Sequence, residues 1–303
     1  MLLHSRLLEF FKPQGVGARV MGRKGKARQD KGASPPMPRM PKAAPSEQEE
    51  ELRAALSGRA LLLRYQPIIR LRNGHTAALE GLVRWPRQEA LLQAGAFVPL
   101  AEKLGLALDL THAVLERVAH DWQQTPSPKG GLAVNMPLSV LLLPQMPAIL
   151  AATLRRHGAR RGPLLLELTE TEAIRDPSRL RRVMLGLKRL GISVLLDDVT
   201  LGDHRWRLAG LPFAGVKLDR SLVEALPRQM RARHFLRRIL KDSHAKGRYV
   251  IAEGVSNSLL YRTTRGLGVD FAQGFLLGQP EPPQQNRGGQ TRLSPARRGG
   301  RAP

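Results

Sequence analysis

Polar residues that could bind a metal ion or a phosphate stand at the ends of apolar runs in the middle of this chain. Seven runs share the pattern, and the polar residues are Glu80, Asn135, Glu167, Asp197 with Asp198, Lys217, Glu253 and Gln273. Five of these are carboxylates, which would repel one another in a shared pocket unless a cation lay between them. Carboxylate and amide oxygens suit Mg²⁺ or Mn²⁺, and a pair of such ions is a common clamp for phosphodiester hydrolysis.

The apolar runs have the length of strands and alternate with segments of helical period. The clearest predicted helix covers residues 176–190, with Asp176 as N-cap, Pro177 at the first helical position and Gly191 after the end. Alternating strands and helices indicate parallel βα units, and eight strands indicate a closed α/β barrel of the TIM type. Side chains at the C-terminal strand ends of such a barrel meet at one mouth.

The first two predicted strands depart from a simple eightfold barrel. Residues 61–71 and 76–82 are separated by four residues that include Asn73-Gly74. An Asn-Gly pair between two apolar runs is a strong hairpin signal. We therefore expect the first strand to be antiparallel to the second.

Composition limits the chemistry that the chain can perform. The 303 residues are 42% hydrophobic and contain no cysteine. A disulfide framework, a cysteine zinc site and a thiol nucleophile are therefore excluded. The length suits one large domain, which we place at residues 49–283.

The net charge of +24 is concentrated toward both ends of the chain. We predict disordered basic tails at 1–48 and 284–303, because their Pro, Gly, Lys and Arg residues can bury little apolar surface. The tails could make weak contacts with nucleic acid or an anionic surface. No apolar stretch approaches the roughly 20 residues of a membrane span, and charges interrupt the first 11 residues, so we expect a cytoplasmic protein.

Several short motifs resemble those of a known bacterial family, the EAL-domain phosphodiesterases that linearise cyclic di-GMP. Glu80-Gly81-Leu82-Val83-Arg84-Trp85 is similar to the family's signature Glu-Ala-Leu-x-Arg-Trp, with Gly in place of Ala. The other motifs follow in the family's order: Tyr65-Gln66-Pro67-Ile68, Phe97 to Glu102, Val134-Asn135, Glu167-Leu168-Thr169-Glu170, Asp197-Asp198, Lys217 to Ser221, Ala252 to Val255, and Gln273-Gly274-Phe275. The resemblance implies an EAL-like TIM barrel whose substrate is cyclic di-GMP and whose product is linear pGpG.

The resemblance also implies roles for individual residues. Those that would ligate a first Mg²⁺ or Mn²⁺ are Glu80, Asn135, Glu167 and Asp197. Asp198 would help to hold a second ion. Glu253 would act as general base on the attacking water, and Lys217 would position that water or neutralise charge.

Further residues would contact the substrate or support the site. Arg84 would bind a phosphate of the substrate, Gln66 and Asp219 would contact the ligand, and Gln273 would orient water at the metal. Glu170 would steady the loop that follows the double aspartate.

That loop is where the chain departs from the family. After the first aspartate the family runs Asp-Phe-Gly-Thr-Gly-Tyr-Ser-Ser-Leu, whereas residues 198–206 keep only the Asp and one Gly. A β-branched residue such as Thr200 disfavours positive φ, so we expect a different loop path. Because this loop supports metal binding and homodimer contacts in the family, two interpretations stay open. The chain is an enzyme, or it is a catalytically impaired receptor for cyclic di-GMP or a protein-interaction scaffold.

Overall fold

The computed structural model describes residues 46–124, 131–157, 164–169, 174, 176–205 and 211–283. All of them belong to one compact unit, Pro45–Pro303. The predicted tails lie outside the described residues, except for residues 46–48. A helix begins there at Glu47, two residues before the expected domain boundary, because Ser46 and Glu49 form a reciprocal capping box at its N-terminus.

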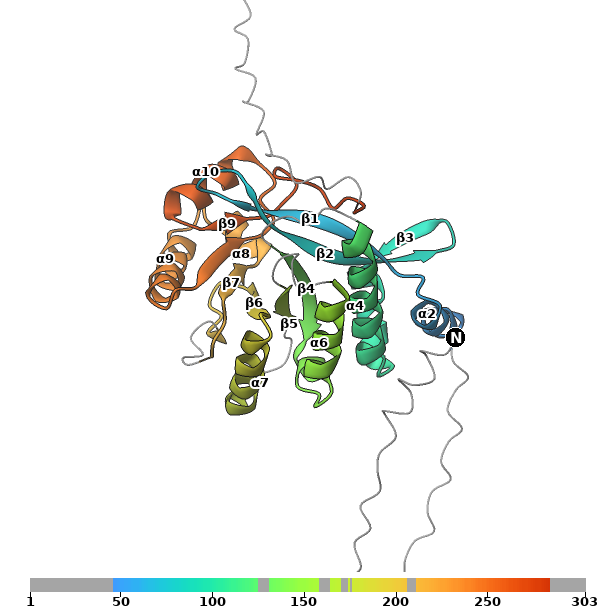
Figure 1. The fold of residues 1–303 in the computed structure, drawn as a ribbon. Helices are drawn as coiled ribbons and strands as arrows, with labels where there is room; N and C mark the ends of the chain where they lie inside the picture. The colour runs from blue at the N-terminus through green and yellow to red at the C-terminus, as the bar shows by residue number, and fades with distance from the viewer. Residues whose placement is uncertain are drawn as a thin grey trace, which may run out of the picture. The chain divides into compact units, whose positions relative to one another are not determined.

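Nine strands of the described chain form one sheet (Figure 1). They are β1 (Leu62–Arg70), β2 (Thr76–Arg87), β3 (Ala90–Gln93), β4 (Leu132–Pro137), β5 (Leu164–Thr169), β6 (Ser193–Val199), β7 (Gly215–Leu218), β8 (Tyr249–Ala252) and β9 (Phe271–Ala272). The order β1-β9-β8-β7-β6-β5-β4-β2, with β1 also paired to β2, closes eight of them into a barrel. The predicted eight-stranded barrel is confirmed.

Strand β1 is the antiparallel member of the barrel. It runs antiparallel to β2 on one side and to β9 on the other, whereas the pairs from β2–β4 round to β8–β9 are parallel. The turn at Asn73-Gly74 joins β1 to β2, with Gly74 at φ 72°. The antiparallel first strand that the Asn-Gly turn predicts is therefore present.

Strand β3 is an element that the sequence did not predict. It pairs antiparallel with the end of β2 and extends that strand into a hairpin beyond the barrel (Figure 1). Its four residues are mostly exposed, so they carry no alternation of apolar and polar side chains that would have revealed a strand.

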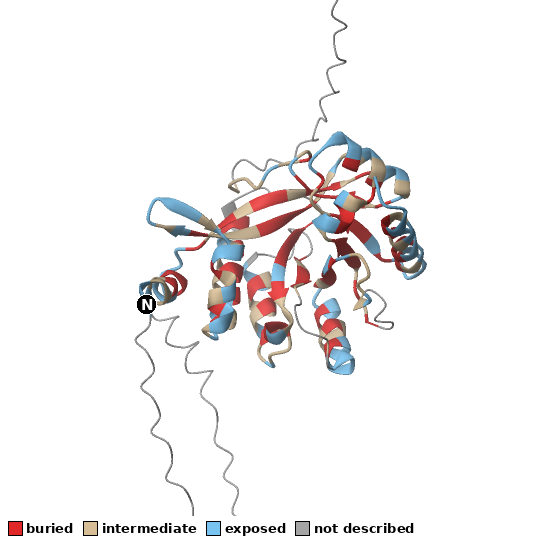
Figure 2. Cartoon of the chain, turned by 180° about the vertical axis from the view of Figure 1, so that it is seen from behind, coloured by how far each residue is buried: buried red, intermediate tan, exposed pale blue. Residues whose placement is uncertain are grey.

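Helices cover the outside of the barrel. They are α2 (Glu47–Ser57), α3 (Val98–Lys103), α4 (Ala107–Gln124), α5 (Leu138–Leu141), α6 (Met146–His157), α7 (Pro177–Arg189), α8 (Arg220–Ala225), α9 (Met230–Ala245) and α10 (Ser258–Leu267), with the 3₁₀ turn η1 (Ala94–Ala96). In α7, Asp176 caps the N-terminus and Pro177 is the first residue, as predicted. Buried residues concentrate on the strands and on the inner helix faces (Figure 2).

Candidate functional site

Two layers of side chains fill the inside of the barrel. The lower layer is apolar and contains Ile68, Ala78, Ala133, Leu195, Ile251 and Phe271. Side chains of a strand alternate between its faces, so the residue two positions further along points to the same side. On five parallel strands, the residue two positions after the apolar one is polar. These residues form the polar layer: Glu80, Asn135, Asp197, Glu253 and Gln273.

Strands β5 and β1 obey the same rule. On β5 the step leads from Leu165, which packs against the apolar layer, to Glu167. On the antiparallel β1 the step is reversed, and Gln66 precedes Ile68 by two residues. The antiparallel direction of β1 thus brings Gln66 opposite Glu80 of β2. One geometric rule therefore brings the predicted polar residues to one level of the barrel.

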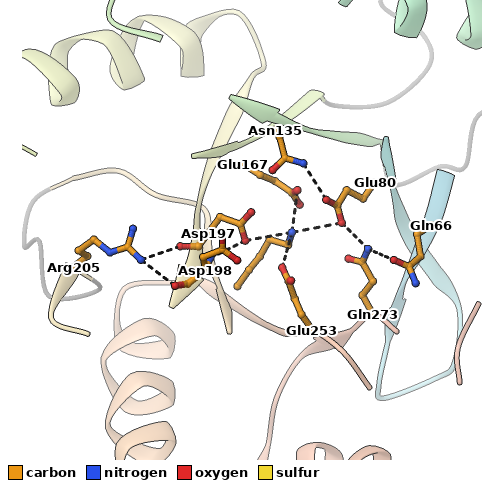
Figure 3. A network of polar contacts seen from close by, with 10 residues as sticks. Gln66, Glu80, Asn135, Glu167, Asp197, Asp198, Arg205, Glu253 and Gln273 are labelled. Carbon is orange, nitrogen blue, oxygen red and sulfur yellow. Dashed lines mark hydrogen bonds and ion pairs between the residues drawn. The ribbon is translucent and has the colours of Figure 1, made fainter. Parts of the chain in front are cut away.

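The ammonium group of Lys217 lies at the centre of the polar layer. Its Nζ is 2.6 Å from Glu253 Oε1, 2.9 Å from Glu167 Oε2, 3.4 Å from Asp197 Oδ1 and 3.6 Å from Glu80 Oε2. Figure 3 shows the four carboxylates converging on this centre. Lys217 and Glu167 are almost wholly buried.

Side-chain amides orient Glu80. Asn135 Nδ2 donates to Glu80 Oε1 over 3.2 Å, and Gln273 Nε2 donates to Glu80 Oε2 over 2.6 Å. Gln273 Nε2 also donates to Gln66 Oε1, and Gln66 in turn donates to the carbonyl of Gly278. Gln66 is buried, as are Glu80 and Gln273 in the same network.

Burial and mutual repulsion separate the acidities of the carboxylates. Burial and the neighbouring Glu80 raise the pKa of Glu167 well above its usual value. Burial also acts to raise the pKa of Glu80, but Lys217 and the amide hydrogen bonds outweigh it and lower that pKa. Burial opposes the charge of Lys217 as well, yet the surrounding carboxylates raise its pKa well above the usual value. The charged form of the lysine is therefore favoured by its neighbours.

Asp198 and Glu253 form the second part of the site. Burial raises the pKa of Glu253 to about 8, although Lys217 acts to lower it. Burial and the charge of Asp197 raise the pKa of Asp198. Oxygens of Asp197, Asp198 and Glu253 lie within 4.8 Å of one another, a spacing at which one cation could contact all three.

The donor set fits divalent cations. Four carboxylates contact Lys217, and Asp198 lies close to two of them, so the negative charge of the ionised site exceeds what one lysine can balance. Among the described residues, Oε1 of the buried Glu167 has no hydrogen-bond partner, whereas its Oε2 lies 2.9 Å from the ammonium group of Lys217. Unsatisfied buried oxygens of this kind are costly unless a cation binds them. An all-oxygen set suits Mg²⁺ or Mn²⁺.

Other predicted site residues lie at the margin. Arg84, half-buried on β2, faces the same side as Glu80 and donates to the carbonyl of Val83. Burial and the neighbouring Arg64 lower its pKa. Asp219 caps helix α8 through its bond to the backbone N–H of Ser221. Glu170 lies outside the described residues.

Sequence reasoning missed three charged residues near the site. Arg64 follows from the register of β1, because it lies two residues from Gln66 and so faces the same side. Asp203 and Arg205 belong to the loop after Asp198, where Arg205 bonds to both Asp203 and the carbonyl oxygens of the double aspartate. No local sequence signal indicates those carbonyl contacts. In the loop, the positive φ falls at Gly202 and not at Thr200.

Fold and site together define an α/β barrel with one antiparallel strand and a carboxylate-rich mouth suited to metal ions. Residues 49–280 match the family model described as the EAL domain. The chain therefore belongs to the EAL-domain family, as the sequence motifs predict.

The chain is similar to known members of that family. It is 30% identical over 240 residues to the bifunctional diguanylate cyclase/cyclic di-GMP phosphodiesterase MucR of Pseudomonas aeruginosa, covering 78% of this chain and 35% of MucR. It is 29% identical over 236 residues to the probable cyclic di-GMP phosphodiesterase PdeB of Escherichia coli, covering 76% of this chain and 45% of PdeB. The chain thus spans less than half the length of these two relatives.

A solved structure carries the same fold. The PaMucR phosphodiesterase in complex with cyclic di-GMP superposes with a TM-score of 0.68 at 29% identity, covering 77% of this chain and 96% of that one. Within the part of this chain that the structure describes, no helix is long and apolar enough to cross a membrane.

Proposed function

We propose that this chain hydrolyses one phosphodiester bond of cyclic di-GMP to give linear pGpG, with Mg²⁺ or Mn²⁺ as its cofactor. The observation that carries the proposal is the ring of carboxylates and amides at one level of an EAL-domain barrel, centred on a buried lysine. Relatives described as cyclic di-GMP phosphodiesterases, and a similar barrel in complex with that nucleotide, support the choice of substrate.

The proposal includes two cations in the polar layer. Four residues form the proposed first site: Glu80, Asn135, Glu167 and Asp197. Asp198 lies with Asp197 and Glu253 in a second group, and these residues would hold a second ion. When bound, such ions would lower the pKa of a water molecule and offset charge on the phosphoryl group.

Glu253 is the proposed general base. It follows the C-terminal end of β8 at the mouth, and it is partly accessible, in contrast to Glu167. Its raised pKa lies near neutral pH, where a base can both accept a proton from water and release it again. Lys217, 2.6 Å away, would hold the deprotonated carboxylate in place and stabilise negative charge that develops on the phosphoryl oxygens.

The substrate would enter between the rim arginine and the loop after β6. Arg84 lies four residues after Glu80 on β2 and so faces the same side, where its guanidinium would bind a phosphate oxygen. Gln273 and Gln66 are proposed to act mainly by holding Glu80, because their amides are already bonded in that network. Asp219, between the C-terminal end of β7 and the start of α8, would contact the ligand from the other side of the mouth.

Product analysis tests the proposal. The full chain is incubated with cyclic di-GMP and Mn²⁺, and the products are separated. We expect pGpG from the wild type and from the control Glu224→Gln, an exposed residue paired with Arg220 outside the site. Glu253→Gln should retain nucleotide binding and release no pGpG. Folded, metal-loaded wild type that forms no product contradicts the proposal.

The second candidate function is a catalytically impaired receptor for cyclic di-GMP. The altered loop after Asp198 favours this candidate. This loop lacks the family's glycine at Thr200, and the glycine that it keeps, Gly202, has a positive φ of 90°. Calorimetric titration decides between the two candidates. Tight binding of cyclic di-GMP without turnover selects the receptor, whereas binding with release of pGpG selects the enzyme.

A further inference from the structure

The double aspartate lies on a β-bulge. In the pairing of β6 with β7, two residues, Asp197 and Asp198, lie opposite Lys217 alone. Asp198 has φ 54°, a left-handed conformation that non-glycine residues rarely adopt. A bulge disrupts the strand ladder and re-aims side chains, and bulges of this kind recur beside active sites. Something outside the ladder must therefore stabilise this backbone.

Arg205 contacts the bulge from the following loop. Its Nη2 donates to the carbonyl oxygen of Asp198 over 3.0 Å and lies 3.4 Å from the carbonyl oxygen of Asp197. Figure 3 shows the guanidinium turned toward both aspartates. One side chain thus contacts the two carbonyl groups at the point where the ladder is broken.

Asp203 fixes the direction of Arg205. Its Oδ1 accepts a hydrogen bond from the backbone N–H of Arg205, and its Oδ2 accepts one from Arg205 Nε, both over 2.8 Å. An ion pair of 2.7 Å joins the same Oδ2 to Nη2. The guanidinium is therefore held at several points, which a flexible lysine ammonium could not reproduce.

We propose that Arg205, oriented by Asp203, is a positioning residue that holds the Asp197–Asp198 bulge with both carboxylates turned toward the metal site. Both residues lie within the segment that departs from the family pattern. The inference rests on the proposed function only in taking the site to bind divalent cations.

The sign of the effect on metal affinity separates positioning from simple charge. A guanidinium near a cation site repels the cation, so its removal would tighten metal binding if charge were its sole effect. If Arg205 positions the ligands, its removal weakens metal binding instead. Arg205→Lys keeps the positive charge but loses the planar guanidinium group with its several N–H donors. It therefore separates the effect of charge from the effect of positioning.

Mn²⁺ titration calorimetry on the full chain tests the inference. We expect Arg205→Met and Arg205→Lys to weaken Mn²⁺ binding by roughly 10–100-fold, the usual effect of losing a group that orients metal ligands. Asp203→Asn should weaken it less. The matched control is Arg233→Met, because Arg233 also donates to two carbonyl groups, those of Leu226 and Pro227, over 2.7 Å each. It should bind Mn²⁺ within twofold of wild type.

The outcomes distinguish this inference from the proposed function. Unchanged or tighter Mn²⁺ binding by Arg205→Met overturns it, as does wild-type affinity in Arg205→Lys. If wild type binds Mn²⁺ and hydrolyses nothing, the proposed function fails, while weakened binding in the variants still supports the role of Arg205. Wild type that binds no Mn²⁺ overturns both. Circular dichroism without metal checks folding, and Arg205→Lys with Asp203→Asn decides the matter if Arg205→Met does not fold.

Discussion

Lys217 Nζ and Glu167 Oε2 lie 2.9 Å apart, and both side chains are almost completely shielded from solvent. A buried ion pair of this kind is strongly destabilising when one partner is removed, because the other charge remains unpaired. Three further carboxylates contact the same ammonium group, so Lys217 acts as the internal counter-ion of the whole layer.

We expect Lys217→Met to destabilise the metal-free protein by about 3–5 kcal/mol, because the carboxylates around it lose their buried cation. Denaturant unfolding in the presence of a chelator measures the loss. Added Mn²⁺ should restore more stability to the variant than it adds to wild type, since the metal replaces the missing charge. The control is Lys246→Met, whose ion pair with Asp242 is partly exposed and should contribute little. An equal loss in both variants contradicts this account.

The raised pKa of Glu253 predicts a pH dependence of stability in the metal-free protein. The folded pKa is about 8 and the ordinary value is 4.5, so between these values the folded state holds a proton that the unfolded state has released. This contribution is complete below about pH 4.5 and is lost as the pH rises through 8. Glu253→Gln should flatten the decline of unfolding free energy by about 1.4 kcal/mol per pH unit. Denaturant titrations between pH 5 and 8.5 test this, and an identical slope in the variant refutes it.

Replacing either of two glycines beside the site by alanine should change the stability of the protein, in opposite directions at the two positions. A Cβ at Gly274, which has φ 153°, would overlap the backbone of Val255, so Gly274→Ala should cost about 1–3 kcal/mol. A Cβ at Gly81 would lie 3.5 Å from Tyr65 Cε1 and 3.6 Å from the carbonyl of Ala133, which is ordinary contact. Gly81→Ala, which restores the family's Ala, should stabilise the protein by roughly 0.4–1 kcal/mol. Thermal unfolding of both variants measures the difference, and a loss of stability in Gly81→Ala contradicts the packing described.

Arg84→Met should weaken binding of cyclic di-GMP by roughly 10–100-fold, the effect of losing a charged hydrogen bond of about 1.5–3 kcal/mol. Its affinity for Mn²⁺ should stay at the wild-type level, because Arg84 lies on the rim and not among the metal donors. Calorimetry in the Glu253→Gln background prevents turnover during the titration. Arg72→Met, an exposed change in the β1–β2 turn, is the control. Nucleotide affinity equal to that of the control shows that Arg84 does not bind the phosphate.

The main features of the barrel could be predicted from the sequence, because they depend on local signals. Asn73-Gly74 predicts the antiparallel hairpin, and Asp176 with Pro177 predicts the start of α7. The polar residues at strand ends could be predicted for the same reason, since a period of two along each strand decides which residues face inward. Strand β3 could not, because its exposed residues pair only through their backbone with β2.

By itself, the sequence determined which residues could form a metal-binding layer and in which family of barrels they occur. Only the tertiary structure decided how that layer is held together. Closure of the barrel buries Lys217 among four carboxylates from other strands, and their electrostatic interactions depend on distances that no sequence spacing specifies. Tertiary structure likewise decided that Arg205 lies against the carbonyl groups of Asp197 and Asp198. The bulge interrupts the pairing of β6 with β7 at these two residues, so their carbonyl oxygens can accept hydrogen bonds from Arg205.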